Sequence, residues 1–170
     1  MLGGPAAPNG EEPELTVSAP QLLAGTTGGI KVMRDWRATF LQVETDPGFD
    51  LATSRVYYAA RKVWSLNGEA GAETSLQPDS VQCLEGKVIV APRVDSILAF
   101  LERDVGPIKT AQRIDLCSLA APLLVCGHVT STSLDALADY FGVPDRASKL
   151  DTMIEVWEGL LAAYLLKVDR

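Results

Sequence analysis

Glu44 is the residue of this sequence best placed for chemistry, because it closes the apolar stretch RATFLQVETDP, residues 37–47. The pattern of that stretch predicts an inner strand, with Phe40 and Gln42 on one face and Leu41 on the other. A carboxylate at the end of a central strand suits metal-dependent phosphate chemistry, since divalent cations prefer hard oxygen ligands. A strand-end glutamate that faces water is the more frequent arrangement, so both interpretations stay open.

A second set of residues suits contact with nucleic acid. Tyr58, Arg61 and Lys62 lie close together in the next β-rich stretch, residues 54–68. Aromatic rings can stack on bases, and cations can follow a phosphate backbone. Burial of the ring in a core and a solvated strand face explain the same residues equally well. These three residues are therefore candidate nucleic-acid contacts.

Other residue clusters lack the pattern that their chemistry would need. Cys117, Cys126 and His128 offer three potential zinc ligands where a structural site takes four, and no paired Cys-x-x-Cys occurs. His128 is the only histidine, and no nucleophile motif flanks it. The glycines of AGTTGG, residues 24–29, lack the lysine of a phosphate-binding loop. The three cysteines suit reduced thiols better than a disulfide framework.

Composition narrows the class of protein. The chain has 170 residues, of which 47% are hydrophobic, enough for the core of one domain. Its net charge of −7 disfavours tight, sequence-indifferent binding to nucleic acid, which depends on a surplus of Lys and Arg. A metal-dependent nuclease tolerates such acidity, because carboxylates hold its cations. The first residues show no basic region followed by an apolar run, so we expect no secretory signal, and no apolar run is long enough to span a bilayer. We therefore expect an intracellular, cytoplasmic protein without membrane association.

The apolar periodicity predicts strands first and helices after. Residues 1–30, rich in Gly and Pro, are expected to form a mobile N-terminal tail, and residues 31–170 a single domain. We expect strands over residues 36–45, 54–68 and 86–92. Helices are expected over residues 93–104, 113–124, 133–142 and 148–170. This order predicts an α/β or α+β fold with the helices packed on the sheet.

Several stretches together resemble one family. FLQVETDP, VYYAARKVW, IDLCSLAAPLL, TSLDALADYFGVP and LDTMIEVWEGLL occur in an order similar to that of the ribonuclease H-like 3′–5′ exonucleases of the DEDD superfamily. The branch that they resemble includes the proofreading domain of family B DNA polymerases. The resemblance implies a ribonuclease H-like fold and phosphodiester hydrolysis by two divalent metals about 3.5–4 Å apart. It implies Mg²⁺ or Mn²⁺ as cofactor and single-stranded DNA or RNA as partner.

The resemblance also assigns residues. In the family, a first strand ends in Asp-x-Glu-Thr and a last helix carries Tyr-x-x-x-Asp. Glu44 is accordingly an implied metal ligand and catalytic residue. Tyr164 and Asp169 are implied as the water-orienting tyrosine and the last catalytic, metal-binding aspartate, although the two stand five positions apart where the family has four. Asp151 is the further implied metal ligand.

Two departures weaken the implied metal site. Gln42 stands where the family has the leading aspartate, and an amide oxygen carries no negative charge. The second acidic motif has no match, and Asp104 is its only nearby candidate. We therefore predict an exonuclease-like, nucleic-acid-processing domain with weakened or no activity, and with no cofactor if it is inactive. The alternatives are a non-enzymatic interaction subunit of a larger complex, with a protein partner, and a helix-turn-helix DNA-binding module, whose second helix is too acidic for that role.

Overall fold

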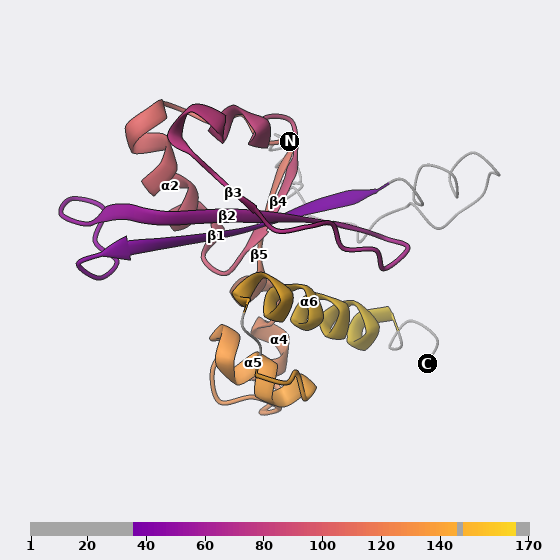
Figure 1. Ribbon diagram of the computed structural model, residues 1–170. Coiled ribbons are helices and arrows are strands. Elements are labelled where there is room, and N and C mark those ends of the chain that lie inside the picture. The colour runs from indigo at the N-terminus through magenta and orange to yellow at the C-terminus, as the bar shows by residue number, and fades with distance from the viewer. Residues whose placement is uncertain (1–35, 146–147, 166–170) are drawn as a thin grey trace, which may run out of the picture.

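A computed structural model describes residues 36–145 and 148–165 of the chain (Figure 1). The N-terminal tail expected over residues 1–30 and the candidate ligand Asp169 lie outside these ranges. Within them, no helix combines the length and the apolar character that crossing a membrane would need. The fold below refers to these residues.

A mixed five-stranded sheet forms the middle layer, with strand order β3-β2-β1-β4-β5. Strand β1 pairs antiparallel with β2 and parallel with β4, and β4 pairs parallel with β5. The predictions of strands over residues 36–45, 54–68 and 86–92 are confirmed. In chain order the strands are β1 (Arg37–Asp46), β2 (Arg55–Ser65), β3 (Thr74–Ser75), β4 (Val88–Ala91) and β5 (Gln112–Asp115).

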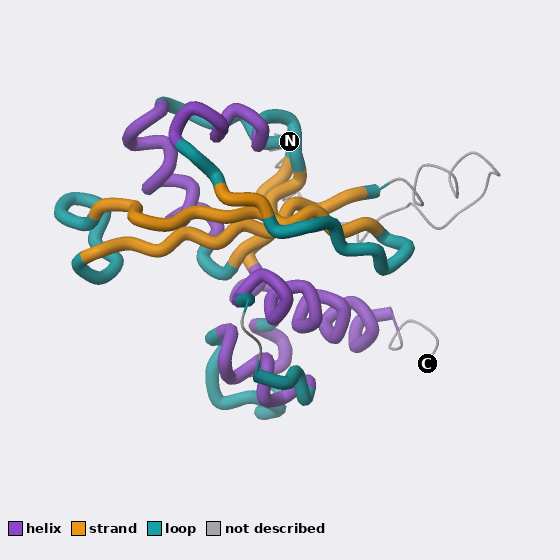
Figure 2. Tube along the Cα trace, viewed as in Figure 1, coloured by secondary structure: helices purple, strands orange, loops and turns teal. Residues whose placement is uncertain are grey.

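Helices cover both faces of the sheet, as Figures 1 and 2 show. One face carries α2 (Val94–Val105) and the 3₁₀ helix η2 (Pro78–Leu84). The other face carries the long α6 (Lys149–Leu165), with the shorter helices beyond it. These are α3 (Leu116–Leu119), α4 (Ala121–Val125) and α5 (Leu134–Phe141). The predicted α/β arrangement, with helices packed on the sheet, is confirmed.

Strand β1 separates two apolar clusters, because successive side chains of a strand point to opposite faces. Phe40 belongs to the cluster under α6, and its ring lies 6.1 Å from that of Trp157, measured between centroids. Leu41 belongs to the cluster under α2. Both are fully buried. A strand that is buried on both faces leaves only its C-terminal end open to a polar site, and Glu44 lies there.

The helix boundaries follow local signals. Ser133 accepts a hydrogen bond from the backbone N–H of Ala136 and so caps α5, as its position in the sequence predicts. Gly142 ends that helix with a left-handed φ of 68°, a conformation that glycine adopts without strain. Arg93 precedes α2 and also has a left-handed conformation, with a φ of 55°. Its N–H donates to the carboxylate of Asp115, which holds this turn directly beside the end of β4.

The helix predicted over residues 113–124 is wrong in part. Its first residues, Arg113–Asp115, belong to β5, which supplies the parallel partner that the edge of β4 needs. Asp115 then accepts from the N–H of Cys117 and starts the short α3. Pro122 lies in the first turn of α4 instead of ending a helix. Proline is well tolerated there, because the first N–H groups of a helix have no intrahelical partner.

Gly159 lies where α6 packs against the Phe141 ring of α5. A Cβ atom at this position would lie 2.6 Å from Cδ1 and 2.7 Å from Cγ of the Phe141 ring. We expect Gly159→Ala to lower the free energy of unfolding by about 1–3 kcal/mol, the usual effect of overpacking. This opposes helix propensity, by which alanine is the better residue. Urea denaturation checks the prediction. In a Phe141→Ala background the same substitution is expected to be neutral or stabilising, and an equal loss in both backgrounds would contradict it.

Candidate active site

Glu44 lies near the C-terminal end of β1 and is fully engaged by neighbouring side chains. Its Oε1 accepts hydrogen bonds from Gln42 Nε2 at 2.8 Å and from Lys149 Nζ at 3.1 Å. Its Oε2 accepts from the Tyr57 hydroxyl at 2.7 Å. Lys149 comes from the first turn of α6 and forms an ion pair with Glu44. The carboxylate thus meets one full positive charge and two neutral donors.

An irregularity in the pairing of β1 with β2 brings Tyr57 to this site. Glu44 pairs with Tyr58 and Thr45 pairs with Val56, so Tyr57 is an extra residue without a partner on β1. Such a β-bulge breaks the strict alternation of a strand and re-aims a side chain. Tyr57 and Tyr58 consequently line the same cavity as Glu44, although they are consecutive residues.

Hydrogen bonding sets the protonation of this cluster. The bond from Tyr57, followed by that from Lys149, lowers the pKa of Glu44, while partial burial opposes the shift. The same bond raises the pKa of Tyr57, because its phenol must stay protonated to donate. Glu44 is therefore held as a carboxylate, and Tyr57 as a neutral phenol.

A second carboxylate, which sequence reasoning missed, lies beside the first. Glu73 accepts from the Tyr58 hydroxyl at 2.7 Å and from the Ser148 hydroxyl at 2.6 Å. These bonds lower the pKa of Glu73, with Ser148 as the larger cause. The residue lies in the connection before β3, where the sequence shows only a polar loop. Its two partners link that connection to the sheet and to the residue that precedes α6.

Asp151 is also paired with a lysine. Its Oδ1 lies 2.5 Å from Nζ of Lys62, and the two form an ion pair. Lys62 extends from β2 on the face covered by α6, since it pairs with Phe40 in the sheet. Both of the predicted metal ligands that the structure describes, Glu44 and Asp151, are thus paired with ammonium groups.

Two cavities meet at Gln42 and Lys149, which line both of them. One of about 470 Å³ is bordered by Glu44, Glu73 and the two tyrosines. The other, of about 560 Å³, lies between the end of β1, the start of α2, α5 and the first turns of α6. Gln42 is 8% exposed and forms part of the wall between the two spaces.

Two further predicted site residues, Arg61 and Tyr164, lie away from Glu44. Arg61 pairs with Leu41 across the strands and so lies on the α2 face, opposite Tyr58 and Lys62. Tyr164 lies near the far end of α6, where its hydroxyl donates to the carbonyl of Leu119. Burial raises the pKa of that phenol. The geometry separates Tyr164 from Glu44 by most of the length of α6.

Comparison with known proteins identifies the fold. No protein-family model matches the sequence, and no curated protein does. Solved structures do match the chain, two structures of exonuclease I among them. The crystal structure of E. coli exonuclease I in complex with a 5cy-dA13 oligonucleotide superposes with a TM-score of 0.56 at 12% identity, covering 78% of this chain and 43% of that one. A second structure of exonuclease I, whose description concerns processivity, superposes with a TM-score of 0.53 at 13% identity. The match covers 79% of this chain and 41% of that one.

The chain has the ribonuclease H-like fold of exonuclease I. It spans about two fifths of the length of the matched exonuclease I chains. The sequence resemblance had implied this fold, and the mixed sheet with β1 at its centre agrees with it. At this level of identity the likeness extends to the fold alone.

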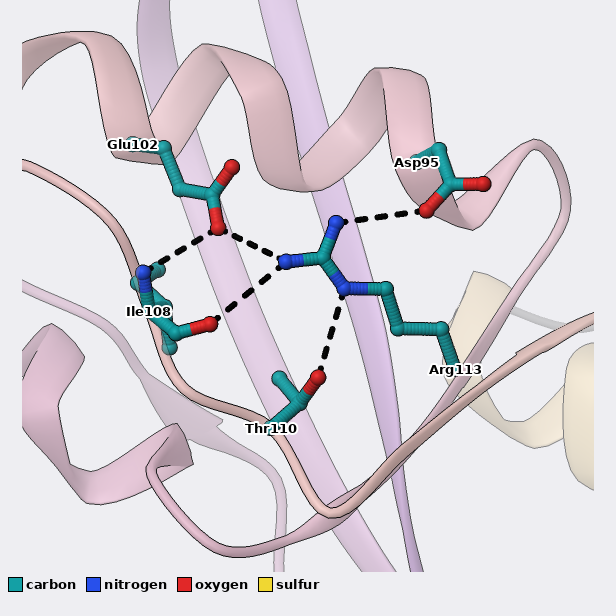
Figure 3. A network of polar contacts seen from close by, with 5 residues as sticks. All are labelled: Asp95, Glu102, Ile108, Thr110 and Arg113. Atoms are coloured by element: carbon teal, nitrogen blue, oxygen red, sulfur yellow. Dashed lines mark hydrogen bonds and ion pairs between the residues drawn. The ribbon is translucent and has the colours of Figure 1, made fainter.

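Two aspartates, Asp95 and Asp104, lie at opposite ends of α2. Asp104 lies at the end of α2 remote from β4 and pairs with Arg103. Asp95 lies in the first turn of α2, shortly after the end of β4. Figure 3 shows that its carboxylate pairs with Arg113, at 3.2 Å, and that Arg113 also contacts Glu102.

The described residues do not fit a two-metal centre. No three His, Cys, Asp or Glu side chains among residues 36–145 and 148–165 lie close enough to hold an ion. Glu44 and Asp151 form ion pairs with lysines, and Asp95 forms one with Arg113. Mg²⁺ needs several hard oxygen ligands in near-octahedral geometry. Gln42 gives its amide N–H to Glu44, so its side chain serves here as a donor.

The hydrogen bonds to Glu44 predict a pH effect on stability. Because the pKa of Glu44 is lowered in the folded state, its contribution is present above the unfolded value, about 4.3, and is lost as pH falls through the folded value. The unfolding free energy of the wild type should therefore fall as the pH is lowered through this range. In Glu44→Gln we expect a smaller fall over the same range. Urea denaturation between about pH 3 and about pH 7 measures how the unfolding free energy changes with pH. Glu69→Gln, at an exposed turn, is the control; equal slopes in all three proteins would refute the prediction.

Proposed function

We propose that this chain is an exonuclease-fold domain that does not hydrolyse phosphodiester bonds and acts as an interaction domain in a larger assembly. The observation that carries the proposal is the pairing of Lys149 with Glu44 and of Lys62 with Asp151. In each pair, a residue of the chain itself neutralises a carboxylate that the family resemblance assigns to metal.

An ammonium group cannot replace the catalytic metal in this chemistry. A divalent ion lowers the pKa of a bound water and stabilises the leaving oxygen of the phosphodiester. A lysine ammonium only donates hydrogen bonds and carries a single charge. With Gln42 at the leading acidic position, the site also lacks a negative charge that would draw a metal in. These features favour an inactive domain over a weakened enzyme.

The charges near the site favour a protein partner over nucleic acid. Tyr58 and Lys62 were candidate nucleic-acid contacts, but both are hydrogen-bonded to carboxylates. Arg61 lies on the other face of the sheet. The chain as a whole has a net charge of −7, and nucleic-acid affinity depends on cations that can displace counterions from phosphate. We infer that this site does not bind a phosphate backbone tightly.

A nucleotide-release assay tests the proposal directly. The full-length protein is incubated with 5′-labelled single-stranded DNA and RNA in Mg²⁺ or Mn²⁺, with Glu44→Ala alongside. We expect no shortening above background with either metal, because the carboxylates are occupied by lysines. Circular dichroism verifies that both proteins are folded. Metal-dependent shortening from the 3′ end that disappears in Glu44→Ala would overturn the proposal.

A gain-of-binding experiment tests the physical reason. Gln42→Asp combined with Lys149→Ala restores a negative charge and removes the ammonium from Glu44. We expect Mn²⁺ to bind this variant at least roughly tenfold more tightly than the wild type, since the number of charged ligands sets cation affinity. Isothermal titration calorimetry measures the two affinities. The control is Lys87→Ala, which removes a lysine outside the site. Unchanged affinity in the double variant would show that Lys149 does not compete with metal.

A further inference from the structure

Strand β2 has an outer edge that is only partly paired. Its inner edge is covered by β1, whereas on the outer edge β3 pairs only with Ala60 and Arg61. The last backbone bond toward the start of β2 runs from the N–H of Leu76 to the carbonyl of Ala59, at 2.8 Å. Beyond it, residues 55–58 have no strand partner on the outer side within the described part of the chain. We call residues 55–58 of β2 the open edge.

A groove of about 330 Å³ lies beside the open edge, on the α2 face of the sheet. It is lined by side chains of β2, of the connection from β3 to η2, of η2 itself and of the end of α2. Leu76, Val81 and Leu101 belong to the apolar cluster under α2 and are at most 7% exposed, yet they line this groove. Val105, at the end of α2, is 37% exposed and lines it too. The groove therefore offers apolar surface directly beside unpaired strand backbone.

Unpaired strand backbone suits one kind of occupant. An edge strand presents a row of N–H and C=O groups, and an extended chain that lies alongside it satisfies them. Strand β3 already pairs in this way at Ala60 and Arg61, so an added segment would continue its track where the chain turns away into η2. The β-bulge at Tyr57 interrupts regular pairing and limits an added strand to a few residues. A short extended peptide therefore fits this edge better than a long strand.

The two faces of the sheet at the open edge differ in character. The apolar groove lies on the α2 face, and the cavity that contains Glu44 and Glu73 lies on the α6 face. Tyr57 and Tyr58 line both spaces. Of the described residues that line the cavity on the α6 face, Lys149 alone is cationic, and it offsets one of the two carboxylates. Side chains of an extended segment alternate between the faces, so apolar residues on one face and basic residues on the other would match this edge.

We propose that the open edge binds a short extended segment of a partner protein, which adds as a strand beside β2. Its apolar side chains enter the groove, and its basic side chains point toward Glu44 and Glu73. This proposal rests on the proposed function as an interaction domain and names the chemistry of its partner. A second copy of the chain is the poorer occupant, because each copy carries a net charge of −7 and its own bulge at Tyr57. Nucleic acid has no amide backbone that could pair with a strand edge.

Fluorescence anisotropy of the full-length chain with labelled peptides tests this assignment. The probe is a peptide in which valine and lysine alternate over about six residues, the usual length of a strand. A control peptide has the same composition, but its valines and lysines stand in separate blocks. Two further versions of the alternating peptide carry an N-methyl group on one or the other of two neighbouring central amides. Successive N–H groups of a strand point to opposite edges, so only one of these methyl groups would meet β2.

Matched protein variants remove the same apolar group inside and outside the groove. Val105→Asn changes an exposed valine that lines the groove. Val125→Asn changes an exposed valine of α4 that does not line it. Circular dichroism verifies that both variants are folded. Size-exclusion chromatography reports whether the chain forms a dimer.

We expect the alternating peptide to bind and the block peptide to bind at least roughly tenfold more weakly. One N-methylated peptide should lose binding and the other should keep it. Val105→Asn should weaken binding at least roughly threefold, because apolar contact is lost, and Val125→Asn should not weaken it.

Four results would each overturn the assignment. They are no binding of the alternating peptide, equal binding of the alternating and block peptides, an equal effect of the two N-methyl groups, and an equal loss in the two variants. A dimer of the chain that excludes the peptide would assign the open edge to a second copy instead, and displacement of the peptide by a single-stranded oligonucleotide would assign it to nucleic acid. The nucleotide-release assay measures a different property of the same protein, so a failure of this assignment is distinguished from a failure of the proposed function.

Discussion

The burial of β1 on both faces is the constraint on which the rest of the structure depends. A central strand that is apolar on both sides must be covered twice, and its two apolar clusters are completed by α2 on one side and α6 on the other. Its neighbours β2 and β4 satisfy its backbone groups from opposite edges. Polar chemistry can then occur only where the burial ends, beyond Leu41 and Phe40. The site at Gln42 and Glu44 is a consequence of the core.

Residues distant in sequence complete that site. Lys149 is 105 positions from Glu44, and Asp151 is 89 positions from Lys62. Both contacts join the N-terminal end of α6 to the sheet, and the Trp157 ring anchors the same helix further along. The rotation of α6 about its axis is therefore fixed by apolar packing at one point and by ion pairs at another. The polar contacts depend on this packing, because a small rotation would carry both charged residues away.

The sequence allowed most of the fold to be predicted, and less of the site. Strands β1, β2 and β4 and helices α2, α5 and α6 follow from apolar periodicity and from capping residues, which are local signals. Strand β5 was missed because it is short and polar, and its pairing with β4 decides its conformation. The partners of Glu44 could not be predicted, because they depend on a bulge at Tyr57 and on the placement of α6 against the sheet.

The lysines at Glu44 and Asp151 change how the site relates to its surroundings. A metal ion enters from solution and leaves again, so its occupancy follows the bulk concentration and any chelator that is present. Lys149 and Lys62 are covalently part of the chain, and holding them costs no translational freedom when they meet their carboxylates. Their local concentration is set by the fold. The pairing of these two carboxylates is thereby set by the fold, although salt screens the more exposed pair, Lys149 with Glu44.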